Sequence, residues 1–176
     1  MELVKVNSKK DLNEVKKLYK SAFPKVEQKP FPLLVFNQWR GMTNIMRIED
    51  KGQFCGLAIT TEKDDKVLLI YFAIAKNKRG EGYGSKALQF MLNKYKDKIF
   101  YLEIESTKVN AENMDQRLKR KSFYLRNGLK ELDFSVNLFG VEMEVLSNGK
   151  TIDFDEYKEL YLKSFSRLIS NKIRKV

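Results

Sequence analysis

The sequence predicts a mixed α/β fold in which strands and helices are arranged around one strand–loop–helix unit. An unbroken apolar run at residues 67–75 is rich in strand-forming side chains and predicts a strand that is buried on both faces. Glycines follow at positions 80, 82 and 84, and from Ser85 to Tyr95 apolar residues recur at helical spacing. Because strand, glycine loop and helix follow one another directly, we expect this unit to be central to the fold.

The N-terminal segments predict further elements of both kinds. In chain order these are a short strand at residues 3–6, a helix at 12–23, a loop at 25–32, a short helix or turn at 33–40, and a hairpin formed by 44–49 and 53–60. Ser8 and Asp11 have the spacing of a capping box, and Pro24 ends the helix that they begin.

The C-terminal half also predicts both strands and helices. In chain order we expect a strand ending at residues 103–105, a helix at 115–126, a hairpin formed by 132–138 and 141–145, and an amphipathic helix at 154–170. Asn127 and Gly128 predict a left-handed cap, and residues 171–176 are expected to fray. The chain should form one domain, residues 1–176, with its core at about 1–147 and a C-terminal helix at 153–171.

Composition restricts the partners and the chemistry. The formal charge is +11, which attracts polyanions, but the cations are spread singly and the densest cluster lies at residues 117–121. A solvated basic surface is therefore favoured over specific nucleic-acid binding. The chain has no His, which excludes His-based triads and HExxH zinc sites, and we predict no metal. The single Cys55 excludes an internal disulfide and is expected to be buried.

Location and assembly are constrained only in part. The longest apolar run, near Val67, is too short to span a bilayer, so no membrane association is expected. The N-terminus lacks the apolar segment of a signal peptide, so a cytoplasmic location is the default expectation. The C-terminal helix could pack on the sheet or form a dimer contact, so the alternatives of monomer and homodimer stay open.

The glycine loop predicts a site for an anionic group. Glycines let the backbone approach a ligand closely, and a helix N-terminus presents N–H groups and the positive end of its dipole. A Walker loop is excluded because Ser85, rather than Lys, follows Gly84. The dinucleotide fingerprint fits Gly82, Gly84 and Ala87, with Glu103 at the distance of a ribose-binding acid. This match is weak because residues 76–79 separate the glycines from the strand.

The remaining pattern is Arg/Gln-x-x-Gly-x-Gly/Ala, which Arg79, Gly82 and Gly84 satisfy. It resembles the acyl-CoA pyrophosphate loop of the GNAT superfamily of N-acyltransferases. One strand and one helix later, that family carries a Tyr followed by a short turn that ends in Gly and an apolar residue. This chain has Tyr124 followed by Asn127-Gly128-Leu129, so both motifs occur in the expected order, and the resemblance covers about residues 52–138.

The resemblance implies a GNAT fold, with a central, mixed but mostly antiparallel sheet that is splayed at the acyl-CoA site and has helices on both faces. It also implies acetyl-CoA as the acyl donor. The implied cofactor-binding residues are Ile74, Ala75, Arg79, Gly80, Glu81, Gly82, Tyr83, Gly84, Ser85, Asn113 and Arg117. Many relatives place an Asn about two turns before the Tyr. Here Arg117 has that spacing and Asn113 lies a turn earlier, so the choice between them stays open.

The implied catalytic residues are Tyr124, Glu103 and Glu105. Tyr124 resembles the family's general acid, which protonates the departing sulfur, and a neutral Tyr with a reference pKa near 10 is a suitable donor. Glu103 and Glu105 alternate with apolar residues and should point to one face of their strand. One of them, or a water that it holds, is the candidate base. The alternatives are a half-buried structural Tyr and two exposed carboxylates that face Lys residues.

The acceptor site is the least patterned part of the sequence. By resemblance, Phe31, Phe36 and Trp39 are expected near the acceptor pocket, although aromatic residues beside a proline loop also serve simple packing. The first functional hypothesis is an acetyl-CoA-dependent N-acetyltransferase that acts on a primary amine of a small-molecule or amino-acid-like acceptor. The alternative is a GNAT-like domain that binds acyl-CoA without turnover, as a sensor or interaction module.

Overall fold

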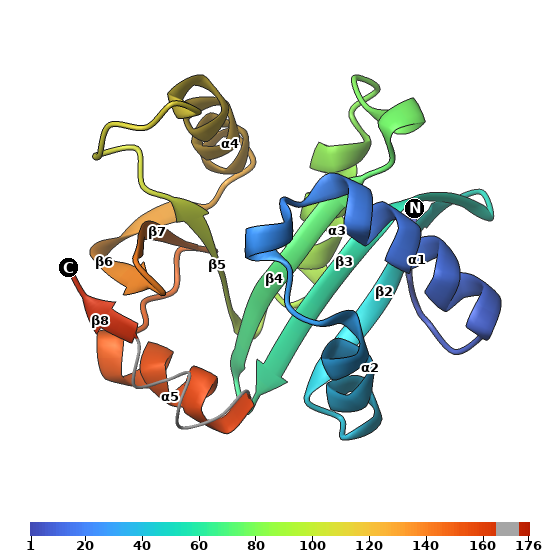
Figure 1. Ribbon diagram of the computed structural model, residues 1–176, viewed down its shortest axis with the longest axis horizontal. Helices are drawn as coiled ribbons and strands as arrows, with labels where there is room; N and C mark the ends of the chain where they lie inside the picture. Colours follow the sequence, from blue (N-terminus) through green and yellow to red (C-terminus); the bar gives the residue numbers. More distant parts are fainter. Residues whose placement is uncertain (165–172) are drawn as a thin grey trace. The chain divides into compact units, whose positions relative to one another are not determined.

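The computed structural model describes residues 1–164 and 173–176 (Figure 1). In chain order the elements are β1 Glu2–Lys5, α1 Lys9–Ala22, η1 Lys25–Glu27, α2 Phe31–Trp39, β2 Thr43–Asp50, β3 Gln53–Lys63, β4 Lys66–Ile74, η2 Lys76–Lys78, α3 Tyr83–Lys94, β5 Ile99–Glu105, α4 Met114–Arg126, β6 Lys130–Leu138, β7 Val141–Ser147, α5 Phe154–Ser164 and β8 Ile173–Lys175, where η denotes a 3-10 helix. The chain divides into two compact units. The N-terminal unit comprises Met1–Glu62 and Leu69–Lys94, and the C-terminal unit comprises Lys63–Leu68 and Tyr95–Val176.

The N-terminal unit is built on strands in the order β1-β2-β3-β4. β1 and β2 are antiparallel, and β2 and β3 form the predicted antiparallel hairpin, with Ile45 opposite Ile59. Gly56 of β3 allows β4 to approach closely, because a Cβ atom at this position would lie 2.4 Å from the carbonyl oxygen of Ala73. The strand predicted at residues 67–75 is β4, and it is confirmed.

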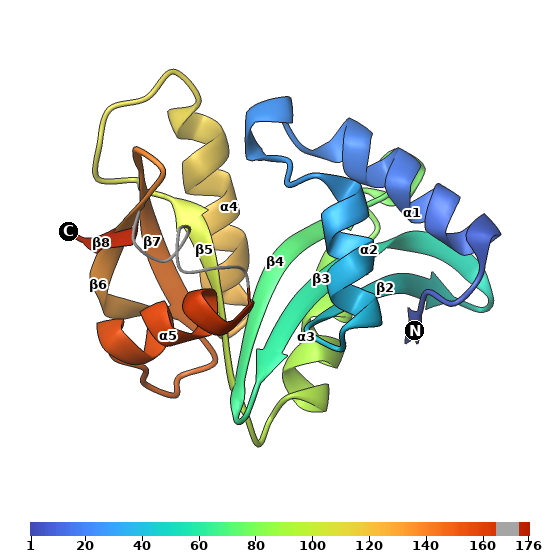
Figure 2. The same ribbon diagram turned by 60° about the horizontal axis from the view of Figure 1, so that its bottom comes forward.

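Helices cover both faces of these strands, with α1 and α2 on one face and α3 on the other (Figures 1 and 2). The first face carries a hydrophobic core that includes Val15 and Tyr19 of α1, Phe31 and Leu34 of α2, and Ile45, Leu57, Ile59 and Tyr71 of the strands. α3 buries Ala87, Leu88 and Met91, the apolar face that the sequence predicts. The capping box is also confirmed, since Ser8 Oγ accepts a hydrogen bond from the Asp11 backbone N–H at 3.1 Å.

The C-terminal unit contains strands in the order β5-β7-β6-β8. β5 and β7 are antiparallel, and β6 and β7 form the predicted hairpin through Phe139 and Gly140, whose φ angles are +53° and +93°. β8 pairs antiparallel with β6, with Val136 opposite Lys175. The prediction that residues 171–176 fray is therefore wrong for Ile173–Lys175, because the outer edge of β6 offers backbone groups with which β8 pairs.

The two helices of the C-terminal unit end and pack largely as predicted. After α4, Gly128 has a φ of +95°, and the Leu129 N–H donates to the Tyr124 carbonyl oxygen at 3.2 Å. α5 buries Tyr157, Leu160 and Tyr161, which confirms the amphipathic pattern as far as Leu162. The rest of the helix predicted at residues 154–170 lies outside the described residues. Within the described residues, no helix is long and apolar enough to cross a membrane.

The fold class predicted from the sequence is confirmed. The five strand pairings named above are antiparallel, and helices accompany the strands in both units. Two helices, α2 and α3, begin two residues earlier than predicted. α2 starts at Phe31 because Pro32 is tolerated in the first turn of a helix, and α3 starts at Tyr83, inside the glycine loop. The splay of the sheet stays a prediction.

Candidate functional site

The glycine loop of the N-terminal unit lies between β4 and α3. Gly80 and Gly82 have φ angles of +85° and +78°, which strain any L-residue. Apart from each glycine and its two chain neighbours, no atom of the described residues lies within 4 Å of the position that its Cβ atom would take. The Lys86 N–H donates to the Gly82 carbonyl oxygen at 3.1 Å, so the N–H groups of residues 83–85 precede the first intrahelical bond. The loop therefore combines open space with backbone donors, a combination that fits a pyrophosphate.

Cationic side chains flank this loop. Lys78 Nζ and Lys86 Nζ lie 5.6 and 5.7 Å from the centroid of the Tyr83 ring. The Tyr83 hydroxyl donates to Asp50 Oδ2 at 3.5 Å, and Glu81 is exposed to solvent. The ring thus lies near two ammonium groups, which add positive charge to the start of α3.

The end of β4, which leads into the loop, already has partners within the unit. The Ala75 N–H donates to the Cys55 carbonyl oxygen at 2.8 Å, and Ala75 in turn accepts from the Lys78 N–H at 2.8 Å. Arg79 Nε donates to the Ile74 carbonyl oxygen at 3.1 Å. Ile74 and Ala75, both predicted to lie along the cofactor, therefore have backbone partners in this state. Cys55 is fully buried, as predicted.

Tyr124 lies in the C-terminal unit, and within the described chain it is the single residue of α4 that is buried. Burial raises the pKa of its phenol to about 12, against the opposing charge of Arg120. Among the described residues its hydroxyl has no hydrogen-bond partner. Tyr124 therefore keeps its proton at neutral pH, and no other described residue accepts that proton in a hydrogen bond.

Glu105 binds the N-terminal half of α4. Its Oε1 accepts from Arg117 Nη2 at 2.9 Å, its Oε2 accepts from Arg120 Nη1 at 3.1 Å, and Asn113 Nδ2 lies 3.2 and 3.3 Å from the two oxygens. Arg117 also donates from Nε to Asn113 Oδ1 at 2.8 Å and from Nη1 to the Ser106 carbonyl oxygen at 2.9 Å. Asn113 and Arg117, the alternative candidates for a cofactor contact, thus belong to one network with a candidate base.

A second carboxylate binds the C-terminal half of α4. Glu144 of β7 is fully buried, and its Oε2 lies 2.5 Å from Lys121 Nζ. Its Oε1 accepts from the backbone N–H and the hydroxyl of Thr107, both at 2.7 Å. Lys121 also pairs with Glu131 at 2.7 Å, and Glu131 pairs with Lys108 at 2.7 Å. Burial raises the pKa of Glu144, but the hydrogen bonds from Lys121 and Thr107 outweigh burial and lower that pKa overall.

Glu103 has different partners from Glu105, although the two residues alternate along β5. Tyr157 Oη donates to Glu103 Oε1 at 2.5 Å, and Tyr161 Oη lies 2.7 Å from both carboxylate oxygens. Tyr101 is fully buried, and its hydroxyl has no partner in the described part of the chain. Burial, followed by the charge of Glu103, raises the pKa of all three phenols. The two carboxylates diverge because Glu105 is the last residue of β5, beside the connection to α4.

The aromatic residues expected at the acceptor pocket have two different environments. Phe31 is 6% exposed and belongs to the core, with its ring centroid 5.4 Å from that of Tyr19. Phe36 and Trp39 are 50% and 81% exposed, and their ring centroids lie 5.9 Å apart. The Arg40 guanidinium lies 5.8 Å from the Phe36 ring. The structure therefore brings Phe36 and Trp39 together on the exposed side of α2, apart from Phe31.

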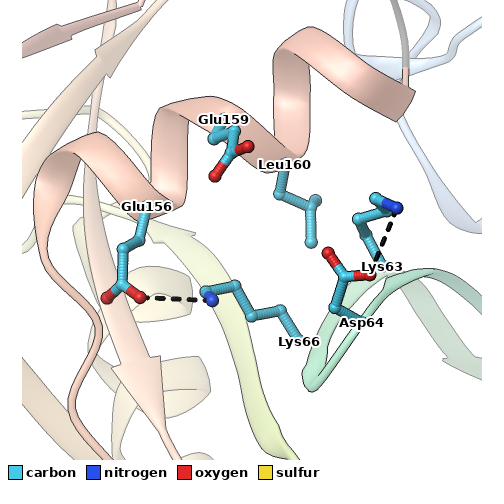
Figure 3. Close-up of a pocket in the computed structure, with 6 residues that line it drawn as sticks. All are labelled: Lys63, Asp64, Lys66, Glu156, Glu159 and Leu160. Carbon is cyan, nitrogen blue, oxygen red and sulfur yellow. Dashed lines mark ion pairs between the residues drawn. The ribbon is translucent and has the colours of Figure 1, made fainter.

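A small pocket lies between α5 and the turn that joins β3 to β4 (Figure 3). It is lined by Lys63, Asp64, Lys66, Glu156, Glu159 and Leu160. Lys66 pairs with Glu156 at 3.2 Å, which ties the turn to α5. The accessible volume is about 10 Å³, on the scale of one water molecule, so this pocket does not fit an organic substrate.

Sequence reasoning missed the carboxylate partners of α4 and α5. The alternation of Val141, Met143 and Val145 assigns Glu144 to the solvent face of β7, yet Glu144 is fully buried. One signal was available: helix 115–126 has few apolar residues for a helix that must cover a sheet, so its cations needed partners. No comparable signal identifies Tyr157 and Tyr161 as partners of Glu103.

Comparisons with known proteins agree on a family. The model of the acetyltransferase (GNAT) family matches residues 12–118, and none of the curated protein sequences compared with the chain matches it. A protein from Bacteroides thetaiotaomicron assigned to GNAT-family acetyltransferases is similar in structure, with a TM-score of 0.77, 17% identity, and coverage of 97% of this chain and 99% of that chain.

Two further solved structures are similar over most of their length. One is an aminoglycoside 6'-N-acetyltransferase complexed with coenzyme A, with a TM-score of 0.64, 10% identity, and coverage of 87% of this chain and 100% of that chain. The other is the ribosomal-protein-S18-alanine N-acetyltransferase from Escherichia coli, with a TM-score of 0.62, 14% identity, and coverage of 87% and 97%. At these identities the likeness concerns the fold alone.

Proposed function

The chain belongs to the GNAT acetyltransferase family, a family of transferases, and we propose that it transfers an acetyl group from acetyl-CoA to a primary amine of a small-molecule or amino-acid-like acceptor. The observation that carries this proposal is the glycine loop, in which open space at Gly80 and Gly82 adjoins the backbone donors of α3. The loop from Arg79 to Ser85 would hold the pyrophosphate of the cofactor, chiefly through N–H groups. Acetyl-CoA, when bound, supplies the thioester carbonyl that the amine attacks.

Tyr124 is proposed as the general acid. Its phenol, with a pKa near 12, stays protonated throughout the working range and can stabilise negative charge that develops on the departing sulfur. Its hydroxyl has no partner among the described residues, so no existing hydrogen bond must break before it donates. Deprotonation of Tyr124 therefore imposes no alkaline limit on activity until the pH nears about 12.

The base is proposed to be Glu103 or a water that it holds. Glu105 is less suited, because the cations Arg117 and Arg120 hold it in ion pairs, whereas Glu103 accepts hydrogen bonds from the neutral hydroxyls of Tyr157 and Tyr161. An ordinary carboxylate, with a reference pKa near 4.3, cannot easily deprotonate an ammonium whose pKa is well above 7, so the proton should pass on to solvent. The kcat/KM of the enzyme should then rise with pH toward the pKa of the amine, without a maximum near 6. A loss of kcat/KM in Glu103→Gln alone would support this role.

The acceptor would contact α2. Phe36 and Trp39 offer exposed aromatic surface for it, and Phe31 would support that helix from the core. A panel of primary amines that includes polyamines, amino-acid amides, aminoglycosides and peptides with free N-termini, assayed by thiol release, identifies the acceptor class. If no amine releases thiol while acetyl-CoA still binds, the chain is the non-catalytic acyl-CoA-binding module instead.

The test of the catalytic assignment is Tyr124→Phe. We expect kcat to fall on the order of a hundredfold or more, with acetyl-CoA affinity by calorimetry nearly unchanged, because the hydroxyl acts on the leaving group rather than on the bound ground state. Tyr101→Phe is the matched control, since it removes a buried phenolic hydroxyl of the same unit and should leave kcat unchanged. An unaltered kcat in Tyr124→Phe would show that water protonates the sulfur.

A further inference from the structure

α4 is attached to its unit differently from the other long helices. Its single buried side chain is Tyr124, whereas α3 buries three apolar residues and α1 buries Val15 and Tyr19, all within the described residues. The apolar residues Leu118 and Leu125 of α4 are 48% and 41% exposed. Apolar burial, which normally holds an amphipathic helix on a sheet, therefore contributes little to the attachment of α4.

Ion pairs take its place, and those of Glu105 are also hydrogen bonds. Glu105 at the end of β5 accepts from Arg117 and Arg120, which are three residues apart and lie on one face of α4. Glu144 of β7 faces Lys121, and Lys121 lies three residues before Tyr124, so the two side chains share a face of the helix. Two carboxylates from different strands thus hold α4 on both sides of its middle.

Such interactions define the position of a helix more precisely than apolar contacts do. The hydrophobic effect is non-directional, so an apolar face tolerates sliding and rotation. Hydrogen bonds between ions are short and angular, and they weaken steeply once geometry is lost. A helix that is held at two points by carboxylates has a defined rotation and axial position. The phenol of Tyr124, three residues after Lys121 on the same helix, inherits this definition.

We propose that Glu105 and Glu144 are positioning residues for Tyr124, which hold α4 in the orientation that aims the phenolic hydroxyl. This inference rests on the proposed function, in which Tyr124 protonates the departing sulfur. It also gives Glu105 a role other than that of a base. Because a misplacement of about 1 Å can lower turnover on the order of a hundredfold, small shifts of α4 should be visible in kcat.

The experiment compares Glu105→Gln and Glu144→Gln with the unaltered protein in three measurements: kcat, acetyl-CoA affinity by calorimetry, and amide hydrogen exchange of α4. We expect kcat to fall at least about tenfold, affinity to stay within about twofold, and exchange to accelerate in α4 but not in α3. Glu156→Gln is the matched control. It removes an ion pair to Lys66 in the same unit and should change none of the three.

Two further readouts separate positioning from base catalysis and from general destabilisation. In Glu105→Gln, kcat/KM should fall by the same factor at every pH, so that the pH profile keeps its shape. Loss of a base would change that shape. In a Tyr124→Phe background, the glutamine substitutions should lower kcat no further. Glu144 is fully buried, so if Glu144→Gln does not fold, Glu105→Gln, whose side chain is 15% exposed, carries the test.

Unchanged kcat and unchanged exchange in Glu105→Gln would overturn the inference, as would losses that add to that of Tyr124→Phe. The proposed function fails in a different way. If Tyr124→Phe alone keeps full turnover, the acid assignment is lost, and hydrogen exchange then decides the attachment of α4 by itself. Faster exchange confined to α4 would support the role of the two carboxylates, and unchanged exchange would refute it.

Discussion

α3 and α4 each follow a strand and each carry a predicted functional element, but they are held by different forces. α3 buries Ala87, Leu88 and Met91, and the functional groups that we propose for it are the backbone donors of its first turn. α4 buries only Tyr124 among its described residues, and carboxylates hold it through Arg117, Arg120 and Lys121. Buried apolar area therefore stabilises α3, for which we propose a backbone site, and directional charge pairs stabilise α4, for which we propose an active side chain.

The difference changes how the basic composition is interpreted. The cluster at residues 117–121 looks in the sequence like a solvated cationic face. In the structure three of its cations pair with carboxylates of the same unit, and one of those carboxylates is fully buried. The charge of α4 is thus partly internal to the unit. A solvated basic surface describes Lys119, which is exposed, better than it describes Lys121.

The largest loss of stability is expected when the ion pair between Lys121 of α4 and Glu144 is broken. Lys121→Ala leaves Glu144 buried without its cation, and loss of one partner of a buried pair costs about 3–5 kcal/mol of unfolding free energy. Lys119→Ala, on the exposed side of the same helix, should stay within about 0.5 kcal/mol. Urea denaturation measures both. Equal values for the two variants would mean that charge does not hold α4.

A cavity created beneath α3 should lower the unfolding free energy about as much as Lys121→Ala does, but for a different reason. Leu88→Ala removes a fully buried side chain and should lower the unfolding free energy by about 2–4 kcal/mol. This loss should be nearly the same in low and high salt, whereas the stabilisation from the half-exposed pair of Arg120 with Glu105 should shrink in high salt. Phe90→Ala, at a residue that is 40% exposed, is the control. A strong salt dependence for Leu88→Ala would remove the contrast between the two helices.

The backbone role at the start of α3 is tested by Gly82→Ala. The methyl group would occupy open space in the loop, and a φ of +78° strains alanine by about 1–2 kcal/mol. We expect this loss of stability together with a loss of acetyl-CoA affinity of at least about tenfold. Gly41→Ala meets the same strain at a φ of +73°, outside the loop, and should retain affinity. If calorimetry finds equal affinity in both variants, the loop is not the cofactor site.

The smallest expected effect is the loss of unfolding free energy at acidic pH. The pKa of Glu144 is lowered on folding, because hydrogen bonds from Lys121 and Thr107 outweigh the effect of burial, and Glu131 behaves alike with Lys108 and Lys121. A lowered folded-state pKa means that this stabilisation is complete above the ordinary pKa of 4.5 and is lost as the pH falls below it. Unfolding free energy should therefore decline on acidification, and less steeply in Glu144→Gln. An identical slope in Glu144→Gln would show that Glu144 does not contribute.

Much of the fold could be predicted because its signals are local. Periodicity identifies β4 and α3, and Asn127-Gly128 identifies the end of α4, since each pattern depends on neighbours in the chain. The motif positions in the glycine loop were predictable for the same reason. Gly80 and Gly82 adopt left-handed conformations, which agrees with the use of glycine at these two positions.

The failures involve partners that are distant in sequence. Lys121 and Glu144 are separated by the end of α4 and by β6, and Glu103 and Tyr157 by most of the C-terminal unit. No short window of sequence therefore shows that they meet. β8 was missed because a short charged segment has no periodicity, and its pairing depends on the free edge of β6. Charge pairs between distant elements produce no periodic pattern in the sequence, whereas buried apolar faces do.

The pairing of β8 with β6 has a consequence for solubility. β6 spans Lys130–Leu138, and without a neighbour its outer edge would expose a row of backbone groups on which another chain could add a strand. β8 covers part of this edge, and the Val176 N–H extends the pairing to the Ser135 carbonyl oxygen at 2.9 Å. The outermost described strand is then only three residues long, with Arg174 and Lys175 exposed, and short charged edge strands resist edge-to-edge aggregation.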